Sequence, residues 1–127
     1  MENNNYIPVE SLVVGNYYIE ELIEEPEFEP GDRFCKALLV EKTDKDMIVY
    51  LCDHWELNEK GRAFITDPVK FKAWQDDNEN YNHETQFENY GFWDEGLVEH
   101  VITKEGKIVN DYVGEIKFLD INTKYKG

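Results

Sequence analysis

The sequence predicts a mostly β fold of the α+β class: a small antiparallel β-barrel or strongly curled sheet of five to six strands, with one short helix. Three observations carry this prediction. They are a clear hairpin between residues 34 and 55, a second hairpin and a further strand near the C-terminus, and one capped helix between the hairpins. Several short strands separated by turn residues are typical of barrels. An SH3-like topology is the first expectation within that class.

The first hairpin is the clearest element. Phe34–Lys42 and Met47–Trp55 are rich in β-branched and aromatic residues, and they flank the turn cluster Thr43–Asp46. Centring the turn on the two middle residues of this cluster places apolar pairs at the centre of both faces. One face then pairs Leu38 with Leu51 and Val40 with Val49, and the other pairs Cys35 with His54, Ala37 with Cys52 and Glu41 with Ile48. We therefore expect a hairpin that is covered on both sides.

Two further turns predict the C-terminal strands. Leu97–Thr103 and Lys107–Val113 flank a turn in which Gly106 is available for positive φ. Glu115–Ile121 follows Gly114 and alternates apolar with polar residues, which predicts a last strand.

The N-terminal stretch Tyr17–Glu25 leaves two alternatives open. A helix would be capped by Asn16 and ended by Pro26. A strand would be entered through Gly15, in an opening of the Leu-x-x-Gly-x-Tyr type that begins many small barrels. The strand is the preferred interpretation.

One helix and one long loop are predicted between the hairpins. Thr66 or Asp67 can cap a helix in which Pro68 suits the first turn and Val69–Gln75 follow. Residues 76–91 have little periodicity and are expected to form a long acidic loop. Loops of this length in compact domains are usually functional.

Length and composition indicate a single domain over residues 1–127. The chain is 41% hydrophobic and 14% aromatic, which is enough for a core. It contains no apolar run of the ~20 residues that a bilayer-spanning helix needs. Its first residues lack the basic and apolar regions of a secretory signal, and it has two cysteines. These features predict a cytoplasmic protein with reduced thiols.

The net charge of −15 is concentrated in two segments. Residues 1–32 contain nine Asp or Glu, residues 73–100 contain eight, and neither segment contains Lys or Arg. The segments 33–72 and 101–127 are nearly neutral, with seven acids and eight bases in the first and four acids and five bases in the second. Such a field disfavours direct binding of nucleic acid or of an anionic membrane, and it favours cationic partners.

The two acidic segments give the leading functional hypothesis, a non-catalytic protein that docks and blocks a basic surface of a nucleic-acid-handling protein. In this form it would be a phosphate-mimic inhibitor, similar in size and acidity to phage-encoded blockers of restriction or CRISPR effectors. Residues 73–95 interleave carboxylates with aromatic side chains, a combination that suits Arg- and Lys-rich partners. The competing interpretation is that these aromatics only plug the barrel. The predicted partner-binding residues are Glu20, Glu21, Glu24, Glu25, Glu27, Glu29, Asp76, Asp77, Glu79, Glu84, Glu88, Tyr81 and Tyr90.

Metal ions, cofactors and catalysis find little support. Cys35, Cys52 and His54 share one face in the predicted register and are weak zinc candidates, but no Cys-x-x-Cys knuckle or fourth ligand accompanies them. The alternating Asp and Asn residues from Asp76 lack the Gly and Glu that an EF-hand needs at positions six and twelve. The chain has no nucleophile elbow, Walker loop or dinucleotide-binding motif. We therefore expect no enzyme, no metal and no cofactor.

A small β-domain with an adaptor or structural accessory role is the alternative function. Its acidity would only keep the protein soluble. A large apolar patch and a stable homo-oligomer would favour this alternative.

Overall fold

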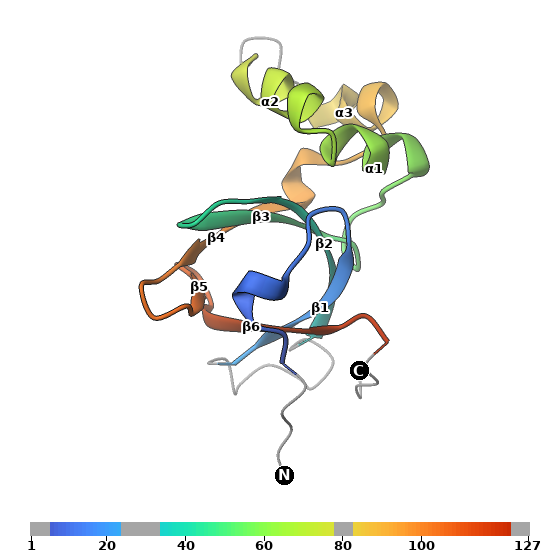
Figure 1. The fold of residues 1–127 in the computed structure, drawn as a ribbon. Coiled ribbons are helices and arrows are strands. Elements are labelled where there is room, and N and C mark those ends of the chain that lie inside the picture. The colour runs from blue at the N-terminus through green and yellow to red at the C-terminus, as the bar shows by residue number, and fades with distance from the viewer. Residues whose placement is uncertain (1–5, 24–33, 78–82, 123–127) are drawn as a thin grey trace.

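Six antiparallel strands form a closed β-barrel in this computed structural model, which describes residues 6–23, 34–77 and 83–122 (Figure 1). Each strand pairs with its neighbours in sequence, and the first also pairs with the last, so the chain follows an up-and-down meander that leaves no free sheet edge. The strands are β1 (Tyr17–Leu22), β2 (Phe34–Lys42), β3 (Asp46–Leu51), β4 (Leu97–Ile102), β5 (Ile108–Asn110) and β6 (Gly114–Asp120). The predicted small barrel is confirmed, as is the preferred strand at Tyr17.

A β-bulge in β2 changes the register of the first hairpin from the predicted one. Leu38 lies opposite Tyr50, and Leu39 lies opposite Val49, so the predicted pairs Leu38–Leu51 and Val40–Val49 are wrong. The register shifts between Leu39 and Glu41, and nearer the turn Glu41 pairs with Ile48 as predicted. The bulge places one extra residue in β2. Beyond it, on the side away from the turn, each residue of β2 pairs one position away from its predicted partner in β3, so different residues share a face.

The C-terminal strands lie where the sequence predicts them, although β5 is short. Gly106 in the β4–β5 turn has a φ of 84°, and Gly114 at the start of β6 has a φ of 82°. Both values lie in the left-handed region that favours glycine. The two glycines therefore allow the tight turns that bring β5 back against β4 and β6.

Among the described residues between β3 and β4 there are three α-helices, so the prediction of one short helix is wrong. They are α1 (Glu59–Ile65), α2 (Pro68–Asp76) and α3 (His83–Tyr90). Helix α2 is the predicted one, and the Asp67 side chain caps it by accepting from Val69 N at 3.0 Å and Lys70 N at 3.1 Å. Helix α1 is absent from the predicted elements, and Gly61 in its interior lowers its helix propensity.

Helix α3 lies inside the segment that we expected to be a long acidic loop. That expectation is wrong for residues 83–90, and residues 78–82 lie outside the described ranges. Aromatic contact holds the C-terminal end of α3, where the Tyr90 ring lies 4.8 Å from the Phe64 ring of α1. Tertiary packing of this kind stabilises short helices whose own periodicity is weak.

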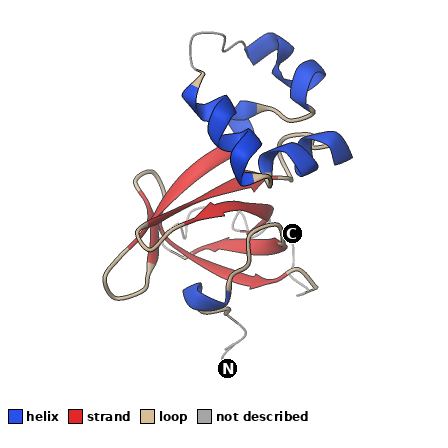
Figure 2. Ribbon diagram, turned by 45° about the horizontal axis from the view of Figure 1, so that its top comes forward, coloured by secondary structure: helices blue, strands red, loops and turns tan. Residues whose placement is uncertain are grey.

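Two hydrophobic clusters cover the two faces of the β2–β3 hairpin. The interior cluster lies inside the barrel and contains Leu12, Tyr18, Ala37, Leu39, Met47, Val49, Ile108, Ile116 and Phe118. The outer cluster lies under the helices, which gather on one side of the barrel (Figure 2), and contains Leu38, Val40, Tyr50, Ile65, Phe71 and Phe92. The prediction that both faces of this hairpin are covered is confirmed. No helix in the described ranges is long and apolar enough to cross a bilayer.

Tyr50 joins the helices to the barrel. Its side chain is fully buried, and its hydroxyl donates to Glu56 O at 2.6 Å and accepts from Trp93 N at 2.9 Å. Glu56 precedes α1 and Trp93 follows α3, so one side chain fixes both connections between the helices and the barrel. Burial raises the pKa of Tyr50 to about 12, which keeps the hydroxyl protonated and able to donate.

The N-terminal segment crosses one end of the barrel (Figure 1). It contains the short 3₁₀ helix η1 (Val9–Ser11), and Ile7 N donates to Phe118 O at 2.8 Å. Leu12 is buried in the interior cluster, and Ile7 and Val9 are half-buried against it. This end of the barrel is therefore closed by apolar side chains.

Candidate functional site

The opposite end of the barrel contains a cavity of about 560 Å³. Its walls come from the last residues of β1, β3 and β5 and the first residues of β2, β4 and β6, because these strand ends meet at one end of an antiparallel meander. The cavity volume lies within the range of about 300–1,000 Å³ that is usual for small-molecule sites. The lining residues are Glu20, Leu22, Cys35, Leu51, His54, Leu97, Val98, Glu99, His100, Asn110, Asp111, Tyr112, Val113 and Ile116.

Two buried polar side chains, Glu20 and His100, lie at this cavity. Glu20 of β1 is 4% exposed and His100 of β4 is 2% exposed, and His100 Nε2 lies 2.7 Å from Glu20 Oε2. Glu20 reaches the interior because it alternates with Tyr18 and Leu22, which both contact the interior cluster. Buried polar groups cost stability unless they are hydrogen-bonded, so this pair requires a physical account.

The Asn110 amide defines the proton position on His100. Asn110 Oδ1 accepts from Tyr112 N at 2.8 Å, and Asn110 Nδ2 donates to Glu99 O at 3.2 Å, which fixes the amide orientation. Nδ2 therefore also faces His100 Nδ1 as a donor, at 3.2 Å. Since Nδ1 accepts, the imidazole is neutral and its proton lies on Nε2, which donates to Glu20. The pair consequently carries the negative charge of the Glu20 carboxylate.

The remaining lining residues make the cavity acidic. Glu99 and Asp111 are exposed at its opening, and no Lys or Arg belongs to the described residues that line it. Cys35 is a thiol rather than a thiolate here, since burial, followed by the charge of Glu20, raises its pKa to about 12. Cys35 is therefore not an activated nucleophile.

The zinc candidates do not share a face as the predicted register implied. Cys35 and His54 line the cavity, whereas Cys52 packs against the outer cluster, because β2 is shifted by one residue relative to β3. Burial also raises the pKa of Cys52, to about 11. Across the described ranges, no group of three His, Cys, Asp or Glu side chains is arranged to hold a metal ion.

A second candidate site is the acidic–aromatic surface, which we define as Phe87, Glu88, Trp93, Asp94 and Glu95. Phe87 of α3 and Trp93 stack with ring centroids 5.1 Å apart and planes 9° apart, and both are half-buried. Glu88 follows Phe87 in the chain, Glu95 lies two residues after Trp93, and both are exposed. Partial burial and the neighbouring Glu95 carboxylate raise the pKa of Asp94. Both effects disfavour the charged form of Asp94, so a cation beside it would be stabilised.

The predicted partner-binding residues are divided between several environments. Glu20 lies in the barrel interior, so its assignment to a protein-binding surface is wrong. Glu21 is half-buried and accepts from Tyr6 Oη at 2.9 Å. Asp76 pairs with Lys72 at 2.8 Å, Asp77 and Glu88 are exposed, and Tyr90 packs against Phe64. Glu24, Glu25, Glu27, Glu29, Glu79, Tyr81 and the side chain of Glu84 lie outside the described part of the structure.

The described parts of the two acidic segments lie on different sides of the barrel. Glu21 belongs to β1, between β2 and β6, whereas α2 and α3 lie over the outer face of β2 and β3 (Figure 1). The acidic–aromatic surface therefore belongs to the second segment alone.

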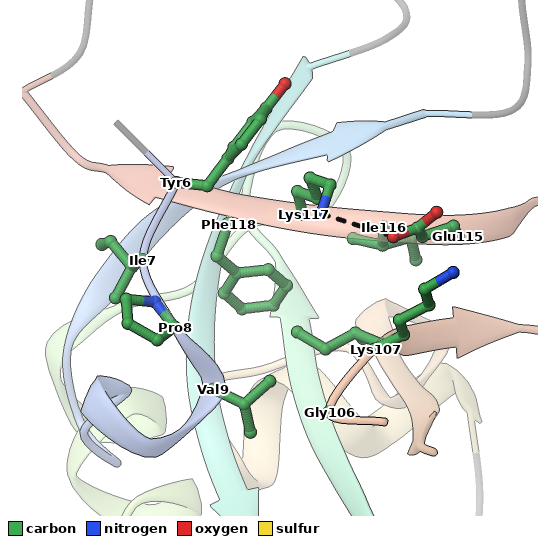
Figure 3. Close-up of a pocket in the computed structure, with 11 residues that line it drawn as sticks. Tyr6, Ile7, Pro8, Val9, Gly106, Lys107, Glu115, Ile116, Lys117 and Phe118 are labelled. Atoms are coloured by element: carbon green, nitrogen blue, oxygen red, sulfur yellow. Dashed lines mark ion pairs between the residues drawn. The ribbon is translucent and has the colours of Figure 1, made fainter. Parts of the chain in front are cut away.

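A smaller cavity of about 190 Å³ lies where the N-terminal segment crosses β5 and β6 (Figure 3). Ile7, Pro8 and Val9 lie beside Phe118 there, and Lys117 pairs with Glu115 at 3.4 Å and lies over the Tyr6 ring. Its volume is below the usual range for ligand sites. This cavity belongs to the closed end of the barrel.

His100 and Asn110 are site residues that the sequence analysis did not select. The signal available for His100 is its place in β4, where it alternates with Val98 and Ile102, two side chains that contact the interior cluster. Comparison of the chain with protein-family models, with curated protein sequences and with solved structures finds no match in any of the three.

Proposed function

We propose that this chain is a non-catalytic binding protein that docks on a basic surface of a nucleic-acid-handling protein and blocks it as a phosphate mimic, in the manner of a phage anti-restriction or anti-CRISPR inhibitor. The observation that carries the proposal is the acidic–aromatic surface. Phe87 and Trp93 stack there, and exposed Glu88 and Glu95 lie one and two residues further along the chain from them, within a segment of 28 residues, 73–100, that contains no Lys or Arg.

Arginine side chains are the best match to this surface. A guanidinium can pair with a carboxylate and at the same time stack on an aromatic ring, which is worth about 0.5–2 kcal/mol for the ring contact alone. Glu88 and Glu95 supply the carboxylates and Trp93 supplies the ring. Surfaces that bind DNA are rich in Arg and Lys because the duplex carries one charge per ~1.7 Å.

Asp94 gives the surface a pH dependence. The pKa of Asp94 is raised by partial burial and by Glu95, so its protonation begins at a higher pH than that of an ordinary Asp. A bound cation favours the carboxylate, and lowering the pH through the raised pKa therefore weakens binding. Asp94→Asn should remove the part of this pH dependence that begins above the ordinary pKa of Asp.

A fluorescein-labelled nonaarginine peptide tests the basic-surface chemistry by fluorescence anisotropy. Glu88→Lys with Glu95→Lys should weaken its binding by roughly tenfold or more, since both charges are reversed where the peptide docks. Asp44→Lys with Glu105→Lys is the matched control, because it changes the net charge equally at exposed positions outside the acidic segments. Binding should also fall steeply with salt. If both double variants weaken binding equally, the acidic–aromatic surface is not the docking site.

Competition with duplex DNA tests the nucleic-acid-handling part of the proposal. Proteins retained on immobilised duplex DNA at low salt should be released by the wild-type chain and by the Asp44/Glu105 control, but not by the Glu88/Glu95 variant. Release by all three chains alike, or by none, would reject the phosphate-mimic role.

The adaptor alternative is distinguished by its requirement for an apolar surface. The large hydrophobic side chains that are exposed in the described ranges come from separate places in the fold, namely Val13 and Val14, Val69, Val101, Tyr112 and Ile121. Isolated exposed apolar residues are ordinary on soluble proteins. Static light scattering checks the point, and a monomer at micromolar concentration is the outcome expected from the docking proposal.

A further inference from the structure

The cavity at the open end of the barrel is a binding site of its own, independent of the acidic–aromatic surface. Its walls are apolar over most of their area, and they are formed by Leu22, Leu51, Leu97, Val98, Val113 and Ile116. Exposed Glu99, Asp111 and Tyr112 stand at its opening, so the cavity is reached from solvent. A volume of about 560 Å³ accommodates a small organic molecule with an apolar body.

The charge in the cavity belongs to Glu20. His100 is neutral in the hydrogen-bonded arrangement that Asn110 fixes, so it donates to Glu20 Oε2 without neutralising the carboxylate. Within the described residues, the second carboxylate oxygen, Oε1, has no hydrogen-bond partner, and no Lys or Arg lines the cavity. A carboxylate in such a place is stabilised by a ligand that brings a positive charge and a donor.

Other ligand classes fit this cavity less well. An anion would meet Glu20, Glu99 and Asp111, with no Lys or Arg among the described lining residues to offset them. A metal ion would need three or more ligands in suitable positions, and the described residues contain no such group. A neutral apolar molecule would leave the Glu20 carboxylate buried without a charged partner.

We propose that this cavity binds a small organic amine, with its ammonium group hydrogen-bonded to Glu20 Oε1 and its apolar body against the leucine, valine and isoleucine walls. In this arrangement His100 and Asn110 are positioning residues that hold Glu20 toward the ligand. Glu99 and Asp111 attract the cation to the opening.

Three compounds of matched size test the charge preference on the wild-type chain. They are 3-phenylpropan-1-amine, 3-phenylpropan-1-ol and 3-phenylpropanoate, and binding is followed by amide chemical-shift changes in two-dimensional NMR. The amine should bind on the order of tenfold more tightly than the alcohol, and the carboxylate should not bind measurably. Shifts should centre on residues 20–22, 97–100 and 110–113. Equal binding of all three, an amine Kd weaker than about 10 mM, or shifts centred elsewhere would overturn the proposal.

Glu20→Gln then tests the contact itself. It keeps the shape of the side chain and removes its charge, so it should reduce the amine affinity by roughly tenfold and leave the alcohol affinity unchanged. Glu105→Gln removes the same charge from the exposed β4–β5 turn and should leave both affinities unchanged. If Glu20→Gln lowers the two affinities equally, or if the control lowers the amine affinity as much, Glu20 is not the ammonium partner. The wild-type series decides the matter if Glu20→Gln does not fold.

Discussion

The outer and inner faces of the β2–β3 hairpin differ in how completely they are filled. On the outer face, aromatic side chains from all three helices contact one another, and the Tyr50 hydroxyl is hydrogen-bonded twice. On the inner face, the buried polar side chains of Glu20 and His100 lie among apolar residues, beside a cavity of about 560 Å³.

This difference separates stability from binding within one small fold. Close apolar packing supplies most of the stability of a domain, and the buried residues of the outer cluster have it. A buried carboxylate beside unfilled volume contributes little stability and costs desolvation. We therefore infer that the outer face holds the structure together, whereas the open end of the barrel is available for a ligand.

The strongest test of the outer face is Gly91→Ala. Gly91 has a φ of 86°, and a Cβ there would overlap the Asn58 side chain and the Gly61 amide. Strain at positive φ and overpacking together should lower the free energy of unfolding by about 4 kcal/mol. Urea unfolding followed by tryptophan fluorescence measures the loss.

Gly106→Ala is the matched control for this substitution. Gly106 has a similar φ of 84°, but a Cβ there would meet nothing within 4 Å. Only the backbone strain remains, so the expected loss is about 1 kcal/mol. Equal losses at the two glycines would mean that the contact between α1 and the end of α3 is looser than described.

The second test compares one substitution with two on the inner face. His100→Leu removes the donor from a buried carboxylate and should lower the free energy of unfolding by about 3 kcal/mol. Glu20→Met with His100→Leu replaces both polar groups by apolar side chains of similar size. This double variant should return to within about 1 kcal/mol of the wild type, because no polar group is then left unsatisfied.

The double variant also separates structure from ligand binding. It should fold as well as the wild type and yet lose the preference for 3-phenylpropan-1-amine over the alcohol. A double variant as unstable as His100→Leu would show that the polar pair is structural, and the distinction between the two faces would fail.

Tyr50→Phe should lower the free energy of unfolding by less than Gly91→Ala or His100→Leu does. It removes a hydroxyl that bonds to Glu56 O and Trp93 N, and the expected loss in the free energy of unfolding is about 2 kcal/mol. Tyr112→Phe is the control, since Tyr112 is 92% exposed and its stability change should be close to zero. A loss confined to Tyr50 would support its role in joining the helices to the barrel.

The strands of the barrel can be predicted from the sequence, but the register of β2 and β3 cannot. Residues that alternate along a strand identify its buried face only if the other face is polar. Both faces of Phe34–Lys42 are apolar because one lines the barrel and the other lies under the helices. The hydrophobic pattern of β2 is therefore compatible with the register both with and without a bulge at Val40, and only the three-dimensional structure shows that the bulge is present.

The candidate sites could be predicted only in part. The charge of Glu20 suggests an exposed residue, whereas its alternation with Tyr18 and Leu22 places it inside the barrel, and the alternation prevails. The cavity is formed by the ends of six strands, so no local sequence pattern predicts it. Phe87 and Trp93 belong to the segment that the sequence analysis selected for partner binding, but their stacking depends on α3, whose helical periodicity is weak.

The smallest expected effect is on the pH dependence of stability. It comes from the two thiols, Cys35 on the inner face and Cys52 on the outer face. Burial raises the pKa of Cys35 to about 12 and that of Cys52 to about 11. In the unfolded chain a thiol titrates near pH ~8.5. Because the folded pKa is the higher one, each thiol stabilises the fold fully below pH ~8.5 and loses that contribution as the pH rises toward the folded value.

Urea midpoints between about pH 8 and about pH 10 isolate the thiols, since Tyr50 begins to contribute only above its unfolded pKa of about 10. The midpoint should fall across this window, and Cys35→Ala and Cys52→Ala should each make the fall shallower. Both folded pKa values lie above the window, so the two variants should flatten the curve by similar amounts although one thiol is inside the barrel and the other outside. Cys52 lines a hollow on the outer face together with Tyr17 and Trp55. If only Cys35→Ala flattens the curve, water reaches Cys52 through this hollow.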